Sequence, residues 1–230
     1  MYFTIFDTET TGLTSKDEVI QLSALLVRET TEEEKNARRL AGKKVSNLSL
    51  MKFYEYYCDT QQTIEPKAQQ VHGIDKALLH EKSGGKTFED IFIPFTKNVK
   101  NDIVQDNHSS GTTNCWVAYN SAFDKRLVNQ TLQHNGLPAF DFGKEIALIR
   151  DEARDTNFCL MKGVMSVGDG KRRKLMEVLG QIYSEETVKK SFSLFANNCN
   201  LDPEMSFHNA SYDIFCTYLV LEHYFNKLRG

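Results

Sequence analysis

FDTETTGL, at residues 6–13, places two carboxylates, Asp7 and Glu9, one residue apart at the end of an apolar segment. The residues before it are strand-like, and alternate residues of a strand point to the same face, so the two carboxylates are expected to lie side by side. Like charges held together near a partly buried strand end are tolerated when a cation neutralises them. The stretch therefore indicates a divalent metal site. A bare Asp-x-Glu is equally compatible with an ordinary strand that runs into a polar Thr-Gly turn.

The composition is that of a globular protein. The chain has 230 residues, 40% of them hydrophobic and 26% charged, which is enough for one sizeable core. We expect a single domain over residues 1–230. No apolar run approaches the roughly 20 residues of a membrane span, and the N-terminus lacks the features of a secretory signal. The expected location is therefore intracellular, in the cytoplasm, where the five scattered cysteines would be reduced thiols.

The charge balance excludes a tight, non-specific binder of duplex nucleic acid. The formal net charge is −3, so no global basic field surrounds the chain. Local basic segments at residues 35–44 and 171–174 could still attract a nucleic-acid substrate, and each is equally compatible with a solvated loop.

Hydrophobic patterning predicts an α/β fold. Strands are expected at residues 2–6, 18–27, 50–58 and 115–119, with a fifth short strand at 155–159. The 106–114 run is rich in turn-forming residues and breaks the chain before the fourth strand. Helices are expected at residues 68–79, 88–99, 122–135, 174–183, 187–199 and 211–228. Residues 29–44 are charged and lack apolar periodicity, which predicts an exposed excursion or a poorly ordered loop.

Two further motifs carry carboxylates near predicted helix starts. Asn120-Ser121-Ala122-Phe123-Asp124 follows the fourth strand directly, which places Asp124 in the first turn of the next helix, where a negative charge is favoured. His208 lies five residues before Asp213, a separation of about 140° on a regular helix. The pair can converge only if His208 lies in the loop before that helix. Taken alone, each motif is also compatible with a purely structural role.

Together, these three segments resemble the DnaQ-like 3′-5′ exonucleases, the DEDDh branch of the ribonuclease H-like superfamily. The first motif is Asp7 and Glu9 in FDTETTGL, the second is Asp124 in NSAFD, and the third is His208 and Asp213 in HNASYD. A His-Gly-Ile turn at residues 72–74 adds a fourth match. A related branch has a tyrosine four residues before the last aspartate, a position that holds Asn209 here, so the histidine branch is the match.

The resemblance implies a fold and an activity. The fold would be a ribonuclease H-like mixed sheet of about five strands, the first three antiparallel and the later ones parallel to the first, with helices on both faces. The activity would be metal-dependent release of nucleoside 5′-monophosphates from the 3′ end of single-stranded or frayed DNA, as in proofreading and repair. A DNA polymerase would be a partner of a proofreading enzyme.

The resemblance also assigns roles to residues. Asp7, Glu9, Asp124 and Asp213 would hold two ions, with Asp7 bridging them, and a donor set made of oxygen alone favours Mg²⁺ or Mn²⁺. His208 would take a proton from the attacking water. Thr10 and Leu13 would bind the terminal nucleotide, through backbone contact to its 3′-hydroxyl and packing on its base. Asn120, Phe123 and His72 would complete the substrate pocket, and plain core packing is the alternative for Leu13 and Phe123.

Two other functions stay open from the sequence. The first is a 3′-5′ exoribonuclease, because no residue is identified that reads a 2′-hydroxyl. The second is a catalytically silent module that binds nucleic acid or a polymerase. The presence of all four carboxylates and His208 argues against this second function, because clustered charges are costly to keep without a catalytic use.

Overall fold

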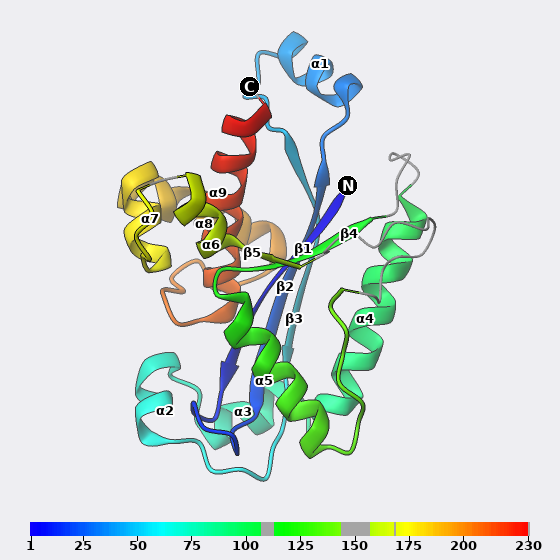
Figure 1. Cartoon of the computed structure of the whole chain (residues 1–230), viewed down its shortest axis with the longest axis vertical. Coiled ribbons are helices and arrows are strands. Elements are labelled where there is room, and N and C mark those ends of the chain that lie inside the picture. The colour runs from blue at the N-terminus through cyan, green and yellow to red at the C-terminus, as the bar shows by residue number, and fades with distance from the viewer. Residues whose placement is uncertain (107–112, 144–156, 168, 230) are drawn as a thin grey trace.

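The computed structural model describes residues 1–106, 113–143, 157–167 and 169–229. The strands are β1 (Tyr2–Thr10), β2 (Val19–Glu29), β3 (Leu48–Tyr57), β4 (Asn114–Ala118) and β5 (Asn157–Cys159). The helices are α1 (Glu32–Leu40), α2 (Pro66–His72), α3 (Lys76–Ser83), α4 (Phe88–Gln105), α5 (Ser121–His134), α6 (Leu160–Val167), α7 (Leu175–Ile182), α8 (Glu185–Cys199) and α9 (Ala210–Arg229). Figure 1 shows their arrangement.

The strands form one mixed sheet with the order β3-β2-β1-β4-β5. β2 pairs antiparallel with both β1 and β3, whereas β4 pairs parallel with β1 and β5 pairs parallel with β4. β5 is only three residues long, and the other part of the fifth predicted strand, at residues 155–156, lies outside the described residues. The predicted α/β class, the mixed sheet and the strand directions are confirmed.

Helices cover both faces of the sheet, and the alternation of β1 decides what each face receives. Phe3 and Ile5 point into a core that α6, α7, α8 and α9 complete. Tyr2 and Phe6 point into a second core, which α4 and α5 complete on the other face. By the same alternation, Asp7 and Glu9 continue the face that α9 covers.

The 29–44 segment is exposed as predicted, but the prediction of a loop is wrong. α1 forms there without burying a single residue. Thr31 makes a capping box with Glu34, the first turn is acidic, and the last turn is basic, which matches the helix dipole. Arg28 of β2 also forms a bidentate ion pair with Glu34, with distances of 2.7 and 2.8 Å. The helix is therefore held by caps and charges that hydrophobic periodicity does not detect.

The predicted helix at residues 68–79 is two helices. α2 ends at Gly73, whose φ of 73° is the left-handed conformation that glycine adopts easily, and α3 begins after Asp75 caps it through the Leu78 amide. α6 was not predicted at all. The other predicted helices form within a few residues of their expected ends, and α4 extends further, to Gln105. Most of the predicted 106–114 break lies outside the described residues.

Two other expectations can be compared with the described residues. The five cysteines are free thiols, as predicted. Within the described part of the chain, none of the helices has both the length and the apolar character that crossing a membrane requires.

Candidate active site

The first two carboxylates lie where strand alternation placed them. Asp7 and Glu9 are half-buried on the same face of β1, between the buried residues Phe6, Thr8 and Thr10. On the neighbouring strand, Ser23 and Gln21 stand opposite them. Because both flanking positions on β2 are uncharged, that strand supplies no cation that would neutralise the pair.

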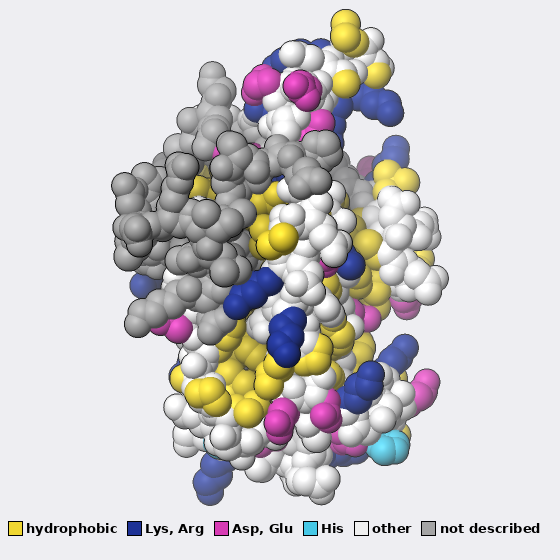
Figure 2. All heavy atoms as spheres, turned by 90° about the vertical axis from the view of Figure 1, so that its right-hand side faces the viewer, with side chains coloured by type: hydrophobic (Ala, Val, Ile, Leu, Met, Phe, Trp, Pro, Cys, Tyr) yellow, Lys and Arg dark blue, Asp and Glu magenta, His cyan; other side chains and the backbone are white. Residues whose placement is uncertain are grey.

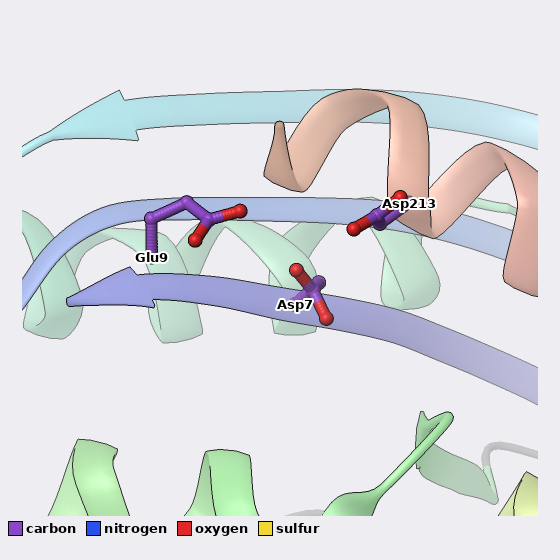
Figure 3. A group of neighbouring side chains, drawn as sticks. All are labelled: Asp7, Glu9 and Asp213. Atoms are coloured by element: carbon purple, nitrogen blue, oxygen red, sulfur yellow. The ribbon is translucent and has the colours of Figure 1, made fainter. Parts of the chain in front are cut away.

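A third carboxylate reaches the same point from the other end of the chain. Asp213 lies in the first turn of α9, and one oxygen each of Asp7, Glu9 and Asp213 lies within 4.8 Å of the others. Figure 3 shows the three side chains meeting between β1 and the start of α9. Of the residues the structure describes, this is the one group of carboxylate, histidine and cysteine side chains with the geometry of a metal site.

A polar network fixes the start of α9 above the sheet. The Ser211 hydroxyl donates to Glu55 of β3 at 2.5 Å and shares a 2.8 Å hydrogen bond with Ser23 of β2. Gln21 accepts from the Ala210 amide at 3.4 Å and donates to Glu55 at 3.1 Å. Because Asp213 lies two residues after Ser211, these hydrogen bonds also fix the position of Asp213. Sequence reasoning missed them, although Gln21, Ser23 and Glu55 are polar interruptions in otherwise apolar strands, which was the available signal.

Burial and repulsion between like charges dominate the electrostatics of the cluster. Burial raises the pKa of Asp7 well above its usual value, and the negative charges of Asp124, Asp213 and Glu9 add to this. Burial, together with Asp213 and Asp124, raises the pKa of Glu9 to about 9. Burial also raises the pKa of Asp213 to about 7. The cluster therefore holds protons at neutral pH that a divalent cation would displace.

Asp124 lies beside the three carboxylates rather than within their group. It occupies the first turn of α5 and is only 3% exposed. Its Oδ1 accepts a 3.1 Å hydrogen bond from the Thr8 hydroxyl, on the β1 face opposite to Asp7. Burial raises the pKa of Asp124 to about 7, and the bond to Thr8 opposes that rise. Thr8 is a further residue that the motif analysis missed.

The donor set fits a hard divalent cation. All three converging groups are carboxylates, and Oδ1 of Asp213 is buried without a hydrogen-bond partner among the described residues. A buried carboxylate oxygen with no partner is costly, and coordination of an ion removes that cost. Magnesium, calcium and manganese favour carboxylate oxygens as ligands, whereas zinc favours imidazole and thiolate ligands.

His208 occupies the loop before α9, as its spacing from Asp213 required. Its φ is 65°, an uncommon conformation for a residue other than glycine, and its side chain is exposed. The backbone amide of His208 donates to Oδ2 of Asp213 at 3.3 Å. The left-handed turn thus brings the histidine backbone to the carboxylate cluster and leaves the imidazole open to solvent.

The loop that joins β1 to β2 presents Leu13 to solvent. Leu13 is 68% exposed, which excludes the alternative that it is a core residue. Thr10 is buried, and its hydroxyl donates to the Gly12 carbonyl at 2.7 Å. A Cβ at Gly12 would lie 2.7 Å from carboxylate atoms of both Asp17 and Glu65, so a larger residue there would have to displace these two side chains.

His72 is engaged within the protein at both ring nitrogens. Nδ1 accepts from the Ile74 amide at 3.0 Å, so Nε2 carries the proton and donates to the Thr10 carbonyl at 3.1 Å. Burial lowers the pKa of His72, and the nearby His208 contributes to this. His72 therefore braces the end of β1.

Asn120 and Phe123 lie at the other side of the strand end. Asn120 is the N-cap of α5, and its carbonyl accepts from the Phe123 amide at 2.8 Å. Phe123 is half-buried at the edge of the second core, with the Arg126 guanidinium 5.6 Å from the centre of its ring. Their predicted contacts with substrate stay predictions.

Solved structures with the same architecture are nucleases. The nuclease domain of 3′hExo, a DEDDh family member bound to rAMP, aligns with a TM-score of 0.60 and 13% identity over 98% of this chain and 92% of that one. Exonuclease X in complex with 5′ overhanging duplex DNA aligns with a TM-score of 0.54 and 17% identity, over 98% and 92% of the two chains. The chain shares the fold of these exonucleases.

The similarity extends to a longer enzyme. E. coli Exonuclease I in complex with a dT13 oligonucleotide aligns over 99% of this chain and 43% of that one, with a TM-score of 0.57 and 13% identity. No protein-family model matches the sequence, and no curated protein matches it significantly. The predicted ribonuclease H-like exonuclease fold is thus confirmed by three-dimensional similarity, at identities that show the fold alone.

Proposed function

We propose that the protein is a metal-dependent 3′-5′ exonuclease that releases nucleoside 5′-monophosphates. The observation that carries this proposal is the convergence of Asp7, Glu9 and Asp213 within 4.8 Å on the exonuclease fold. The group joins residues more than 200 positions apart in the chain, and the first and third exonuclease motifs supply all three members.

In this proposal, the carboxylates bind metal ions and His208 acts as the general base in phosphodiester hydrolysis. Asp7, Glu9, Asp213 and the adjacent Asp124 would hold two ions, Mg²⁺ or Mn²⁺, and the charges of the other three carboxylates all act on Asp7. Bound there, such ions stabilise the charge that develops on the attacking and leaving oxygens. His208 accepts the proton of the attacking water on its imidazole, for which its exposed position in the loop beside Asp213 is suited.

The substrate pocket lies at the end of β1. The exposed side chain of Leu13 packs on the terminal base, and the backbone of Thr10 approaches the 3′-hydroxyl. Asn120 and Phe123 border the pocket from α5, and His72 contributes by holding the Thr10 carbonyl.

Single-stranded or frayed DNA is the substrate that we propose, in a cytoplasmic enzyme that forms a single domain. Exonuclease X and Exonuclease I are described in complexes with DNA, which supports nucleic acid as the partner. The rAMP bound to 3′hExo favours a 3′-5′ exoribonuclease as the second candidate. The comparisons give no support for a polymerase partner.

Digestion of end-labelled oligonucleotides tests the proposal. Matched DNA and RNA single strands are incubated with the protein and Mg²⁺ or Mn²⁺, and released mononucleotides are separated and counted. Asp7→Ala is the test variant, and Glu32→Gln, an exposed carboxylate of α1, is the matched control. We expect shortening from the 3′ end by the parent and the control only. Equal digestion by Asp7→Ala would refute the site, and oligonucleotide binding without nucleotide release would indicate the silent module.

A further inference from the structure

A basic surface lies at the far end of α9 from the carboxylates. The α9-end patch consists of five cations from two regions of the chain, namely Arg38, Arg39, Lys43, Lys44 and Lys227. In Figure 1, α1 and the C-terminal end of α9 lie at the same end of the molecule. Figure 2 shows Lys and Arg side chains on the protruding α1, next to Asp and Glu side chains of the same segment.

Hydrogen bonds join the two regions. The Asn47 side-chain amide donates to the side-chain oxygen of Asn226 in α9 at 2.8 Å. Asn47 lies three residues after Lys44, and Asn226 immediately precedes Lys227. The adjacent Ser46 hydroxyl donates to Glu222 at 2.5 Å. On α1, Arg38 donates to Ser49 at 3.3 Å, which holds the helix against the start of β3. These hydrogen bonds therefore fix the position of the segment that carries the cations relative to α9.

The cations of the patch are available to a ligand. Arg39, Lys43, Lys44 and Lys227 are exposed, and none of the five forms an ion pair with a residue that the structure describes. Lys227 lies 5.7 Å from the centre of the Tyr224 ring. Burial lowers the pKa of His223, and the positive charges of Lys227 and Lys44 lower it further, which agrees with their gathering at this point.

Neighbouring carboxylates offset only part of the patch. Glu222 is buried and accepts from Ser46 and Tyr218, whereas Glu32 in the first turn of α1 pairs with Lys35 and also interacts with the charge of Arg39. The second basic segment adds to the positive field. Lys171, Arg172 and Lys174 are exposed just before α7, a helix that packs against α9.

We propose that the α9-end patch binds the phosphodiester backbone of the nucleic acid whose 3′ end occupies the carboxylate cluster. This inference rests on the proposed function. Lys227 is fourteen residues along α9 from Asp213, or about 21 Å at 1.5 Å per residue. Successive phosphates of one duplex strand advance about 3.4 Å, and a single strand can be more extended, so the patch meets the substrate within roughly six nucleotides of its 3′ end. Because the whole chain carries a net charge of −3, this local field decides where a polyanion lands.

Substrates of different length distinguish the contribution of the α9-end patch from that of the carboxylate cluster. The test variant is Lys43→Glu, Lys44→Glu and Lys227→Glu, and the matched control makes the same charge change at the exposed Lys82, Lys86 and Lys97. For a 20-nucleotide substrate, we expect the test variant to raise KM at least about tenfold with kcat unchanged. The slope of log Kd against log salt should fall by about two. Hydrolysis of the p-nitrophenyl ester of thymidine 5′-monophosphate, which is too short to reach the patch, should not change.

Several outcomes would overturn the proposal. One is an unchanged KM for the long substrate, and another is an equal rise in the control. A third is loss of binding to phosphatidylserine vesicles while oligonucleotide affinity is retained, since that result would assign the patch to a membrane surface. If the parent protein releases no nucleotide from any substrate, the proposed function fails. Fluorescence anisotropy of a labelled oligonucleotide on parent, variant and control then still decides the patch.

Discussion

The paired strands β1 and β2 carry a cluster of buried charge at each end, and the two clusters are built in opposite ways. At one end, Asp7 and Glu9 meet Asp213, and the pKa of Glu9 is raised to about 9 by burial and by like charge. At the other end, Arg28 pairs with Glu34 at 2.7 Å and with Asp106 at 2.9 Å. There, the hydrogen bonds from Arg28 lower the pKa of Glu34 to about 2.

The difference separates a binding use of charge from a structural one. Around Arg28, opposite charges and hydrogen bonds satisfy one another, and the Tyr2 hydroxyl adds a 3.1 Å bond to Asp106. In the carboxylate cluster, Oδ1 of Asp213 is left buried without a partner among the described residues. A cluster of buried like charges raises the free energy of the folded protein, and a bound cation would lower it again, so the cluster is suited to cation binding.

The largest expected effect comes from neutralising the centre of the carboxylate cluster. Asp7→Asn keeps the shape of the side chain but removes a ligand charge, so we expect nuclease activity to fall on the order of a thousandfold. In EDTA at high pH, where the cluster loses its protons, the same variant should unfold at a higher temperature than the parent, because one repelling charge is gone. Activity assays and thermal melts check the two parts. A variant that is both active and less stable would show that the carboxylates do not repel one another in the folded protein.

Breaking the other cluster should cost stability and leave the chemistry alone. Arg28 is 7% exposed, and Arg28→Met leaves Asp106, itself 10% exposed, without its cation. We expect unfolding in urea to show a loss of about 3 kcal/mol, the lower end for an uncompensated buried charge. Lys52→Met, which removes an exposed pair with Asp102, is the matched control and should lose less than about 1 kcal/mol. Equal losses would contradict the distinction.

The clusters should respond to pH with opposite signs. The pKa of Glu9 rises from 4.5 to about 9 and that of Asp213 from 3.8 to about 7, so the folded protein binds more protons than the unfolded chain. In EDTA, the stability that this cluster contributes is present below about pH 4 and is lost as pH rises toward 9. Glu34 behaves in reverse, because its lowered pKa gives stability that is lost as pH falls from about 4.5 to 2.

Melting temperatures in EDTA and in Mg²⁺ across pH 5 to 9 check this expectation. We expect Mg²⁺ to raise the melting temperature more at pH 9 than at pH 5, because protons compete with the ion for the carboxylates. The Asp7→Asn variant should show a flatter pH dependence in EDTA. A stability that increases from pH 5 to 9 without metal would contradict the raised pKa values.

The smallest effect distinguishes two threonines on one face of β1. Thr8 donates to Asp124 at 3.1 Å, and Thr4 donates to the neutral Asn114 at the same distance. Each substitution by valine should cost about 1 kcal/mol of unfolding free energy. Only Thr8→Val should shift the activity profile to higher pH, because the lost hydrogen bond lets the pKa of Asp124 rise. A shift in both variants, measured as kcat against pH, would remove Asp124 from the chemistry.

The elements predicted correctly are those whose stability shows in the local pattern of apolar residues. β1, α5 and α9 carry apolar residues with a clear strand or helix period and pack into the two cores. α1 escaped prediction because its stability comes from the Thr31 capping box and the ion pair from Arg28, neither of which has a period. α2 and α3 were merged because the sequence pattern continues through Gly73, where the backbone turns.

The site shows the same division. Its motif residues could be found from the sequence because each lies in a short segment with a recognisable order. Gln21 and Glu55 were visible as polar residues within strands, but their roles and that of Thr8 could not be predicted, because these depend on which distant side chain each contacts. The two basic segments were visible as charges, yet nothing local indicated that both would flank α9.

By itself, the sequence determined that Asp7 and Glu9 share a face and that His208 precedes the helix of Asp213, since both follow from the geometry of one strand and one helix start. Only the tertiary structure decided that Asp213 joins Asp7 and Glu9, that Asp124 lies beside them with a hydrogen bond from Thr8, and that Lys44 and Lys227 both lie near His223. The physical reason is range. Backbone geometry acts over a few residues, whereas contacts between distant segments form when the apolar faces of the sheet and helices are buried together.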